Sequence, residues 1–130
     1  MRTSILLVAF AALLASGCAT TQTVKEAKGQ GTSRVYRHGY NTVYHATLSA
    51  AKQKRLEVAE DDRKAHRLIL TQGVSWKGLG EKVAVFITPM ARTRTKVEVV
   101  SKPVLAPLNF QPDWQQALLD QIDTELAAKK

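Results

Sequence analysis

The sequence predicts a two-layer α+β domain in which an N-terminal and a C-terminal helix cover one face of a four-stranded antiparallel sheet, in the order αββββα. Two segments, residues 41–54 and 112–127, carry apolar side chains at helical spacing. Between them lie four strand-like runs with short connections, which favour antiparallel pairing. Two helices that are each apolar on one side require a common apolar sheet face, so both are expected on the same side of the sheet.

The first helix is predicted over residues 41–54, with Asn41 as its N-cap. Its C-terminal end contains Lys52, Lys54 and Arg55, which suit the negative end of the helix dipole. Its apolar side chains recur at intervals of three and four, as one buried face requires: Tyr40, Val43, Tyr44, Leu48 and Ala51.

The strands follow the first helix and are rich in apolar and β-branched residues. They are predicted at residues 56–59, 67–76, 83–88 and 95–101. A charged turn at residues 60–64 separates the first two strands, and a hairpin turn at residues 91–94 separates the last two. Pro89 is expected to end the third strand, because proline cannot donate to a ladder of hydrogen bonds.

The second helix is predicted over residues 112–127. Pro112 and Asp113 are both favourable in the first turn, the proline because its φ angle is preset and the aspartate because its charge suits the helix dipole. An apolar stripe continues along the helix and consists of Trp114, Ala117, Leu118, Leu119, Ile122 and Leu126.

Residues 1–17 are typical of a secretory signal peptide. Arg2 gives a positive head, residues 5–14 are apolar and residues 15–17 are small. The longest apolar run, residues 5–15, is shorter than the roughly 20 residues that span a bilayer, so no transmembrane helix is expected. The chain has 19 Lys+Arg and 11 Asp+Glu, and loss of the signal removes only Arg2, which leaves a net charge of +7.

Residues 14–18 read Leu-Ala-Ser-Gly-Cys and resemble the lipobox of bacterial lipoproteins, although Ala15 stands where leucine is more common. The resemblance implies that the Cys18 thiol receives a diacylglyceryl group, that the chain is cut before Cys18, and that the new amino group is acylated, for example with palmitate. Because Ala19 follows where aspartate would retain the protein in the inner membrane, it also implies an outer-membrane anchor with the domain in the periplasm. An ordinary signal peptide with an incidental or buried cysteine is the alternative.

Residues 18–33 are polar and small, with glycines at 29 and 31, and are predicted to form a flexible tether. The folded domain is expected over residues 34–130, a length that can bury a core without disulfides.

No catalytic, metal-binding or cofactor-binding site is predicted. His38 and His45 are seven residues apart, which is about 10.5 Å along one helix and too far for both to bind a single metal ion. His66 could join either of them only through the fold. No serine lies in a nucleophile motif. Asp61 and Asp62 are interpreted as members of a solvated turn, so the sequence favours a non-enzymatic protein.

Clustered basic residues are the remaining functional signal, because such clusters attract anionic partners. The candidate binding residues are Arg92, Arg94 and Lys96 in the hairpin, Lys52, Lys54 and Arg55 at the helix end, and Trp76 as a protein-contact anchor. Arg63, Lys64 and Arg67 form a further basic group. The alternatives are a solvated surface for the charges and burial for the tryptophan. Nucleic acid is not expected, because aromatic side chains are not interleaved with the basic ones.

The element order, the Tyr40, Val43, Tyr44 and Leu48 spacing of the first helix and the Trp114, Leu118 and Ile122 spacing of the last resemble small uncharacterised Gram-negative lipoproteins. They also distantly resemble the helix-grip domains of BamC-type accessory lipoproteins. This resemblance covers residues 40–130 and implies a non-enzymatic accessory or scaffold role in the cell envelope. A small periplasmic hydrolase or ligand-sequestering protein, with a pocket between sheet and helices, is the competing hypothesis.

Overall fold

The computed structural model describes residues 21–73, 80–103 and 113–129. The described elements, in chain order, are α2 (Thr21–Glu26), β1 (Thr32–Tyr36), α3 (Tyr40–Gln53), β2 (Glu57–Asp62), β3 (Arg67–Gln72), β4 (Glu81–Ala91), β5 (Arg94–Pro103) and α4 (Trp114–Ala128). Among these residues no helix is long and apolar enough to cross a membrane. Cys18, Trp76 and Pro112 lie outside the described residues.

The fold is α+β with an antiparallel sheet, but the sheet has five strands in the order β1-β5-β4-β3-β2, where the sequence predicted four. The additional strand is β1, which pairs along β5 from Thr32 opposite Val99 to Tyr36 opposite Thr95. Its sequence is mostly polar, so it shows little apolar alternation. Only its partners reveal it as a strand, since side chains of β1 contact α4 while its backbone pairs with β5.

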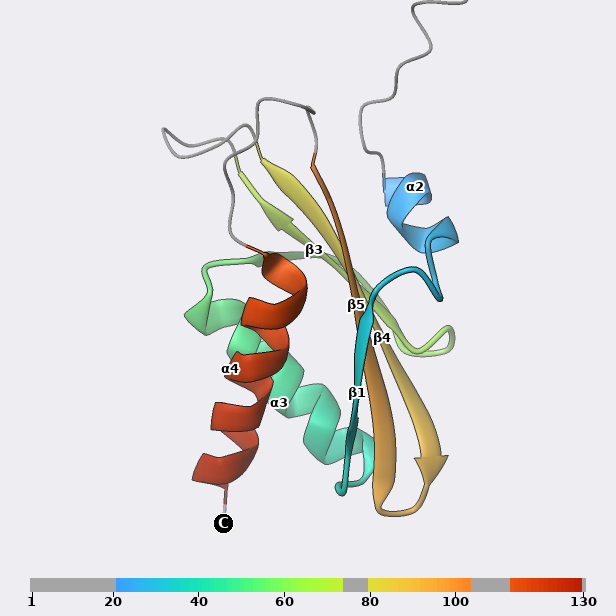
Figure 1. Cartoon of the computed structure of the whole chain (residues 1–130), viewed down its shortest axis with the longest axis vertical. Coiled ribbons are helices and arrows are strands. Elements are labelled where there is room, and N and C mark those ends of the chain that lie inside the picture. Colours follow the sequence, from blue (N-terminus) through green and yellow to red (C-terminus); the bar gives the residue numbers. More distant parts are fainter. Residues whose placement is uncertain (1–20, 74–79, 104–112, 130) are drawn as a thin grey trace, which may run out of the picture.

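Helices α3 and α4 pack together on one face of the sheet, as expected (Figure 1). Their apolar stripes meet the inward side chains of β3, β4 and β5 in one core, and Trp114 is buried in it. Helix α3 begins at Tyr40 with Gly39 as N-cap and no side-chain cap. The predicted cap, Asn41, instead accepts a hydrogen bond from Arg63. Helix α4 is capped by Asp113, whose carboxylate accepts from the Gln115 backbone.

The opposite face of the sheet, called the α2 face below, is partly covered by helix α2 (Figure 1). A second apolar cluster lies there and contains Val24, Ala27, Ile69, Ala84, Phe86 and Val100. Lys25 also forms an ion pair with Glu60 of β2, with 2.7 Å between Nζ and Oε2. The predicted two-layer arrangement and the predicted tether are therefore wrong for residues 21–33. Ile69 and Phe86 are large apolar side chains on the α2 face, and α2 removes them from water.

The two glycines of the predicted tether hold the chain in place. A Cβ atom on Gly31 would lie 2.2 Å from the backbone oxygen of Val99, so only glycine allows this approach to β5. Gly29 has a φ of +90°, which glycine adopts readily. The backbone N–H groups of both glycines donate to the buried Glu98 carboxylate. These contacts fix the connection between α2 and β1.

Pro89 does not end its strand, contrary to expectation, because β4 continues to Ala91 with an irregularity after Pro89. The N–H of Ile87 donates to His66 at the start of β3. Backbone groups two residues apart face the same neighbour, so Pro89 faces the side of β3 but lies beyond Arg67, the first residue of that strand. Its missing N–H therefore removes no sheet hydrogen bond.

Candidate binding surface

The space between the helices and the sheet is filled by apolar side chains in the described part of the chain. Two of the few polar groups there are satisfied locally, because Thr47 donates to the Val43 carbonyl and the Tyr36 hydroxyl donates to the Leu119 carbonyl. Burial, together with the nearby Asp123 charge, raises the pKa of Tyr36 above its ordinary value, so this phenol remains a neutral donor. The described interior is therefore mostly apolar. Its further polar groups are the buried Glu81 carboxylate, which accepts from the Ser101 hydroxyl, and the buried Trp114 indole N–H, which has no partner among the described residues.

The hairpin between β4 and β5 carries three basic residues within five positions, Arg92, Arg94 and Lys96. Arg92 and Thr93 form its two-residue turn, and Ala91 pairs with Arg94 on either side. The buried Thr95 hydroxyl donates to the His38 carbonyl at 2.9 Å, which joins the hairpin to the connection between β1 and α3. A Cβ atom on Gly39 would lie 2.9 Å from the Arg92 carbonyl, so this connection also packs closely against the turn.

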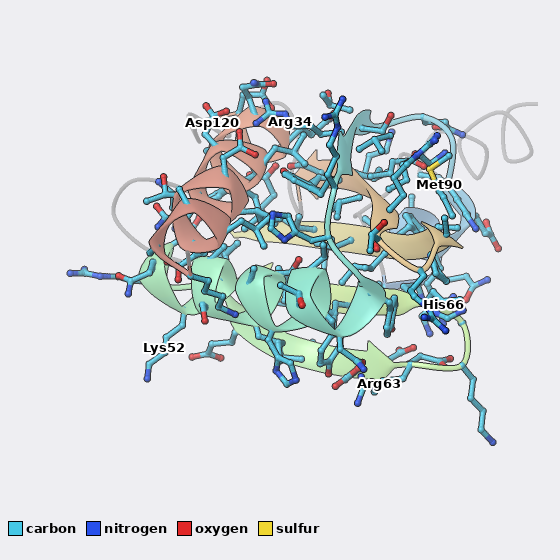
Figure 2. All side chains as sticks on the ribbon, turned by 90° about the horizontal axis from the view of Figure 1, so that it is seen from below. Arg34, Lys52, Arg63, His66, Met90 and Asp120 are labelled. Atoms are coloured by element: carbon cyan, nitrogen blue, oxygen red, sulfur yellow. The ribbon has the colours of Figure 1, made fainter. Side chains whose placement is uncertain are left out.

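Strand pairing brings further residues next to the hairpin. Lys96 of β5 lies opposite Val35 on one side and Thr88 on the other. Because side chains alternate along a strand, all three lie on the α2 face, together with Phe86 and Val100. Val35 is 48% exposed and Met90 is 49% exposed, so this half of the face is not covered by α2. Figure 2 shows Met90 on the side of the sheet away from α4.

We call Arg37, Arg92, Arg94 and Lys96 the basic tip. The segments that carry it, residues 34–38 and 88–96, contain no acidic residue. Within the described residues none of its four side chains forms an ion pair. Arg34 provides the contrast, because it points to the other face and pairs with Asp120 and Asp123 of α4 (Figure 2). The basic tip therefore keeps its charge available to a partner.

The other predicted binding residues are not brought to this surface. Lys52, Lys54 and Arg55 lie at the C-terminal end of α3, whereas the N-terminal end of the same helix lies near the hairpin (Figure 1). Trp76 falls among residues that the structure does not describe.

The third basic group is used inside the fold. The Arg63 guanidinium lies 4.2 Å from the centroid of the Tyr44 ring, a cation–π contact. Arg67 pairs with Glu60 and Asp62 at 3.1 and 3.4 Å. These contacts fix the turn between β2 and β3 and engage Arg63 and Arg67, whereas Lys64 is exposed and forms no ion pair with a described residue.

A small polar cluster at this turn was missed by sequence reasoning. The Tyr44 hydroxyl donates to Asp61, which sequence reasoning placed in a solvated turn. Burial, followed by this hydrogen bond, raises the pKa of Tyr44 to about 12. His66 has a φ of 53°, and its ring lies edge-on to Tyr40 with 5.1 Å between centroids. The cluster joins α3 to the sheet and serves the fold.

Metal binding finds no support in the three described ranges, in which no group of three or more His, Cys, Asp or Glu side chains is placed to hold an ion. The His38 backbone carbonyl accepts from Thr95 of the hairpin, and the His45 ring packs edge-on against Tyr44. His66 lies at the turn between β2 and β3, edge-on to Tyr40. The three histidines thus serve separate local contacts.

Comparison with known proteins gives no sequence match and a weak structural similarity. No family model and no curated protein matches the sequence. Among solved structures, the chain is similar to the di-domain ARO/CYC BexL from the BE-7585A biosynthetic pathway, with a TM-score of 0.43 and 17% sequence identity. The similarity covers 75% of this chain and 43% of that chain, so this protein spans less than half the length of its neighbour. A similarity this weak carries no argument about function.

Proposed function

We propose that this chain is a lipid-anchored, non-enzymatic binding or scaffold protein of the Gram-negative envelope. Its lipid would be attached to Cys18 and would hold it on the periplasmic face of the outer membrane. The basic tip would bind an anionic envelope component or an acidic envelope protein. The anchor part of this proposal rests on the lipobox-like residues 14–18.

The observation that carries the binding part is the basic tip itself. Arg92, Arg94 and Lys96 form no ion pair among the described residues and stand on a hairpin held by Thr95 and by the close packing of Gly39. Arg37, also without an ion pair there, lies in the adjoining connection after β1. A rigid support of this kind lowers the entropy lost when a partner binds. Among the described residues, the mostly apolar packing between helices and sheet supports a surface-binding protein over the competing hypothesis of a hydrolase or ligand-sequestering protein with an internal pocket.

Replacing Cys18 with alanine tests the anchor. We expect the C18A chain to leave the membrane fraction, because thioether lipidation requires the thiol, and to keep its fold, because the described fold begins at Thr21. Fractionation after a salt wash and mass spectrometry of the wild-type N-terminal peptide give the measurement. A C18A chain that stays with membranes, together with a wild-type peptide that carries no lipid, would contradict the proposed anchor.

A further inference from the structure

The length of chain between Cys18 and the fold limits where the domain can sit. Only Ala19 and Thr20 separate Cys18 from Thr21, the first residue of α2. Three residue steps span at most about 11 Å. A lipid on Cys18, which is part of the proposed function and on which this inference rests, would therefore hold the start of α2 close to the lipid headgroups.

Helix α2 lies on one defined side of the molecule. Val24 is fully buried against the sheet, so α2 is fixed to the α2 face, and α3 and α4 lie on the opposite side (Figure 1). The chain therefore meets its proposed anchor on the α2 face. The layer formed by α3 and α4 is kept away from that anchor by the thickness of the sheet.

The charges of the molecule are divided in the same way. Lys82 and Lys102 lie directly opposite each other in β4 and β5 and alternate with Ala84 and Val100, which places both lysines on the α2 face. Like charges placed opposite each other are unfavourable unless an anion lies near them. Neither lysine forms an ion pair with a described residue.

Most acidic side chains of the α2 face are already engaged by the protein itself, and the exposed Glu57 of the edge strand β2 is the exception. The Glu98 carboxylate is buried and accepts from the Gly29 and Gly31 backbones, and Glu60 pairs with Lys25 and Arg67. The opposite side differs, because between positions 113 and 129 helix α4 and its cap carry four acidic residues against one lysine: Asp113, Asp120, Asp123, Glu125 and Lys129. The part of the α2 face formed by β4 and β5 is therefore basic, and α4 is acidic, although α3 beside it ends with Lys52, Lys54 and Arg55.

Exposed apolar side chains complete the pattern. Val35 and Met90 are each about half exposed and lie among Arg94, Lys96 and Arg92. Apolar side chains surrounded by basic ones suit the boundary between lipid headgroups and acyl chains, where the apolar groups enter the boundary and the cations meet phosphates.

We infer that the α2 face lies flat on an anionic phospholipid surface, the same surface that holds the Cys18 lipid. In this orientation Met90 and Val35 lie at the headgroup boundary, Lys82, Lys102, Arg94 and Lys96 lie near lipid phosphates, and α4 faces the periplasm. Basic residues near an anionic bilayer contribute additively to binding. A lipid attached at one residue, by contrast, fixes the position of that residue and leaves the orientation of the domain free. The basic tip thereby acts as a second contact that orients the anchored domain.

The test uses the mature lipidated protein with one introduced cysteine that carries a polarity-sensitive fluorophore. M90C places the probe on the α2 face, and A127C places it on exposed α4 at the opposite side. In the proposed mature chain the Cys18 sulfur is already a thioether, so each variant is labelled at one site. Each protein is reconstituted into phosphatidylcholine vesicles with and without phosphatidylglycerol, and a lipid-borne quencher reports contact.

We expect several-fold stronger quenching at position 90 than at position 127, and only when phosphatidylglycerol is present. Added to M90C, the double change R94Q and K96Q should remove most of this quenching. The matched change K52Q and K54Q, which removes the same charge at the far end of α3, should leave it unchanged. Equal quenching at both positions, or loss of quenching in both double variants, would overturn the inference.

Flotation of the same samples separates the two proposals. A protein that does not float with vesicles contradicts the lipid anchor itself. A protein that floats while its position 90 probe stays in water on both vesicle types overturns only the flat orientation. The basic tip would then be left to an acidic protein partner.

Discussion

Gly31 shows how much a single residue determines at the N-terminal end of the fold. Gly31→Ala should lower the free energy of unfolding by about 1–3 kcal/mol, since the added Cβ would lie 2.2 Å from the Val99 carbonyl oxygen and the backbone must shift. Gly73→Ala is the matched control, because nothing lies within 4 Å of its Cβ position. Urea denaturation measures both, and an equal effect of the two changes would contradict the close approach.

Trp114 is the residue-scale prediction for the main core. The ring is buried at the start of α4 among side chains of the larger apolar cluster. Trp114→Ala should lower the free energy of unfolding by about 3–5 kcal/mol, because it leaves a large cavity. Gln116→Ala, on the exposed side of the same helix, should change it by less than about 0.5 kcal/mol. A loss below about 1 kcal/mol for Trp114→Ala in urea denaturation would show that α4 does not depend on this packing.

At the scale of elements, helix α2 should be separable from the rest of the fold. Six residues are too few for a helix that is stable alone, so α2 depends on its docking contacts. Val24→Asn should undock it, because the amide would be buried in the apolar cluster without a partner. Hydrogen exchange should then speed up at Gly29 and Gly31, while β3 and β4 stay protected by the separate larger core.

Gln22→Asn is the control for this prediction, because Gln22 is exposed on the same helix and the new side chain is the same. Exchange that speeds up equally throughout the sheet in Val24→Asn would show that α2 and the main core unfold as one unit.

The sequence alone predicted those elements whose pattern lies within their own residues. The apolar stripes of α3 and α4 and the alternation in β4 are properties of each segment alone. Strand β1 could not be predicted in this way, since its polar sequence becomes a strand only through pairing with β5 and contacts with α4. Helix α2 was missed for the same reason. One valine in a polar segment does not predict a docked helix, and only the structure shows that Val24 packs against Phe86 and Ile69.

The residues of the candidate surface also differ in whether the sequence alone could predict them. Arg92, Arg94 and Lys96 could be predicted because they are close in sequence and flank a two-residue turn. Arg37 and Val35 could not, because only the pairing of β1 with β5 places Val35 opposite Lys96 and Arg37 just beyond the pair of Tyr36 with Thr95. The contacts of Arg63 and Arg67 could not be predicted either, because their partners come from other elements.

At the scale of the whole molecule, the basic tip should control binding to anionic surfaces. The unlipidated chain 19–130 should co-sediment with vesicles that contain phosphatidylglycerol and not with neutral ones. Arg92→Ser with Arg94→Ser should weaken this binding and leave the fold almost as stable, because exposed charges contribute little to folding. Raising the salt from 0.1 to 1 M should act in the same way, since the Debye length falls from about 10 to about 3 Å.

Changing Lys52 and Lys54 to serine is the matched control for this charge removal. Equal pelleting with neutral and anionic vesicles, or equal weakening by both pairs of changes, would show that the arrangement of the charges is unimportant.

The pairing of β1 with β5 has a consequence for the order in which the chain folds. Thr32 pairs with Val99, whereas Ala91 pairs with Arg94 across two residues, so closing the sheet at β1 costs far more loop entropy than forming the hairpin. We expect β2 to β5 to form first and the N-terminal segment to dock last. The proposed export and the proposed modification at Cys18 would then act on a chain whose N-terminal segment is still extended, before α2 and β1 close over the finished sheet.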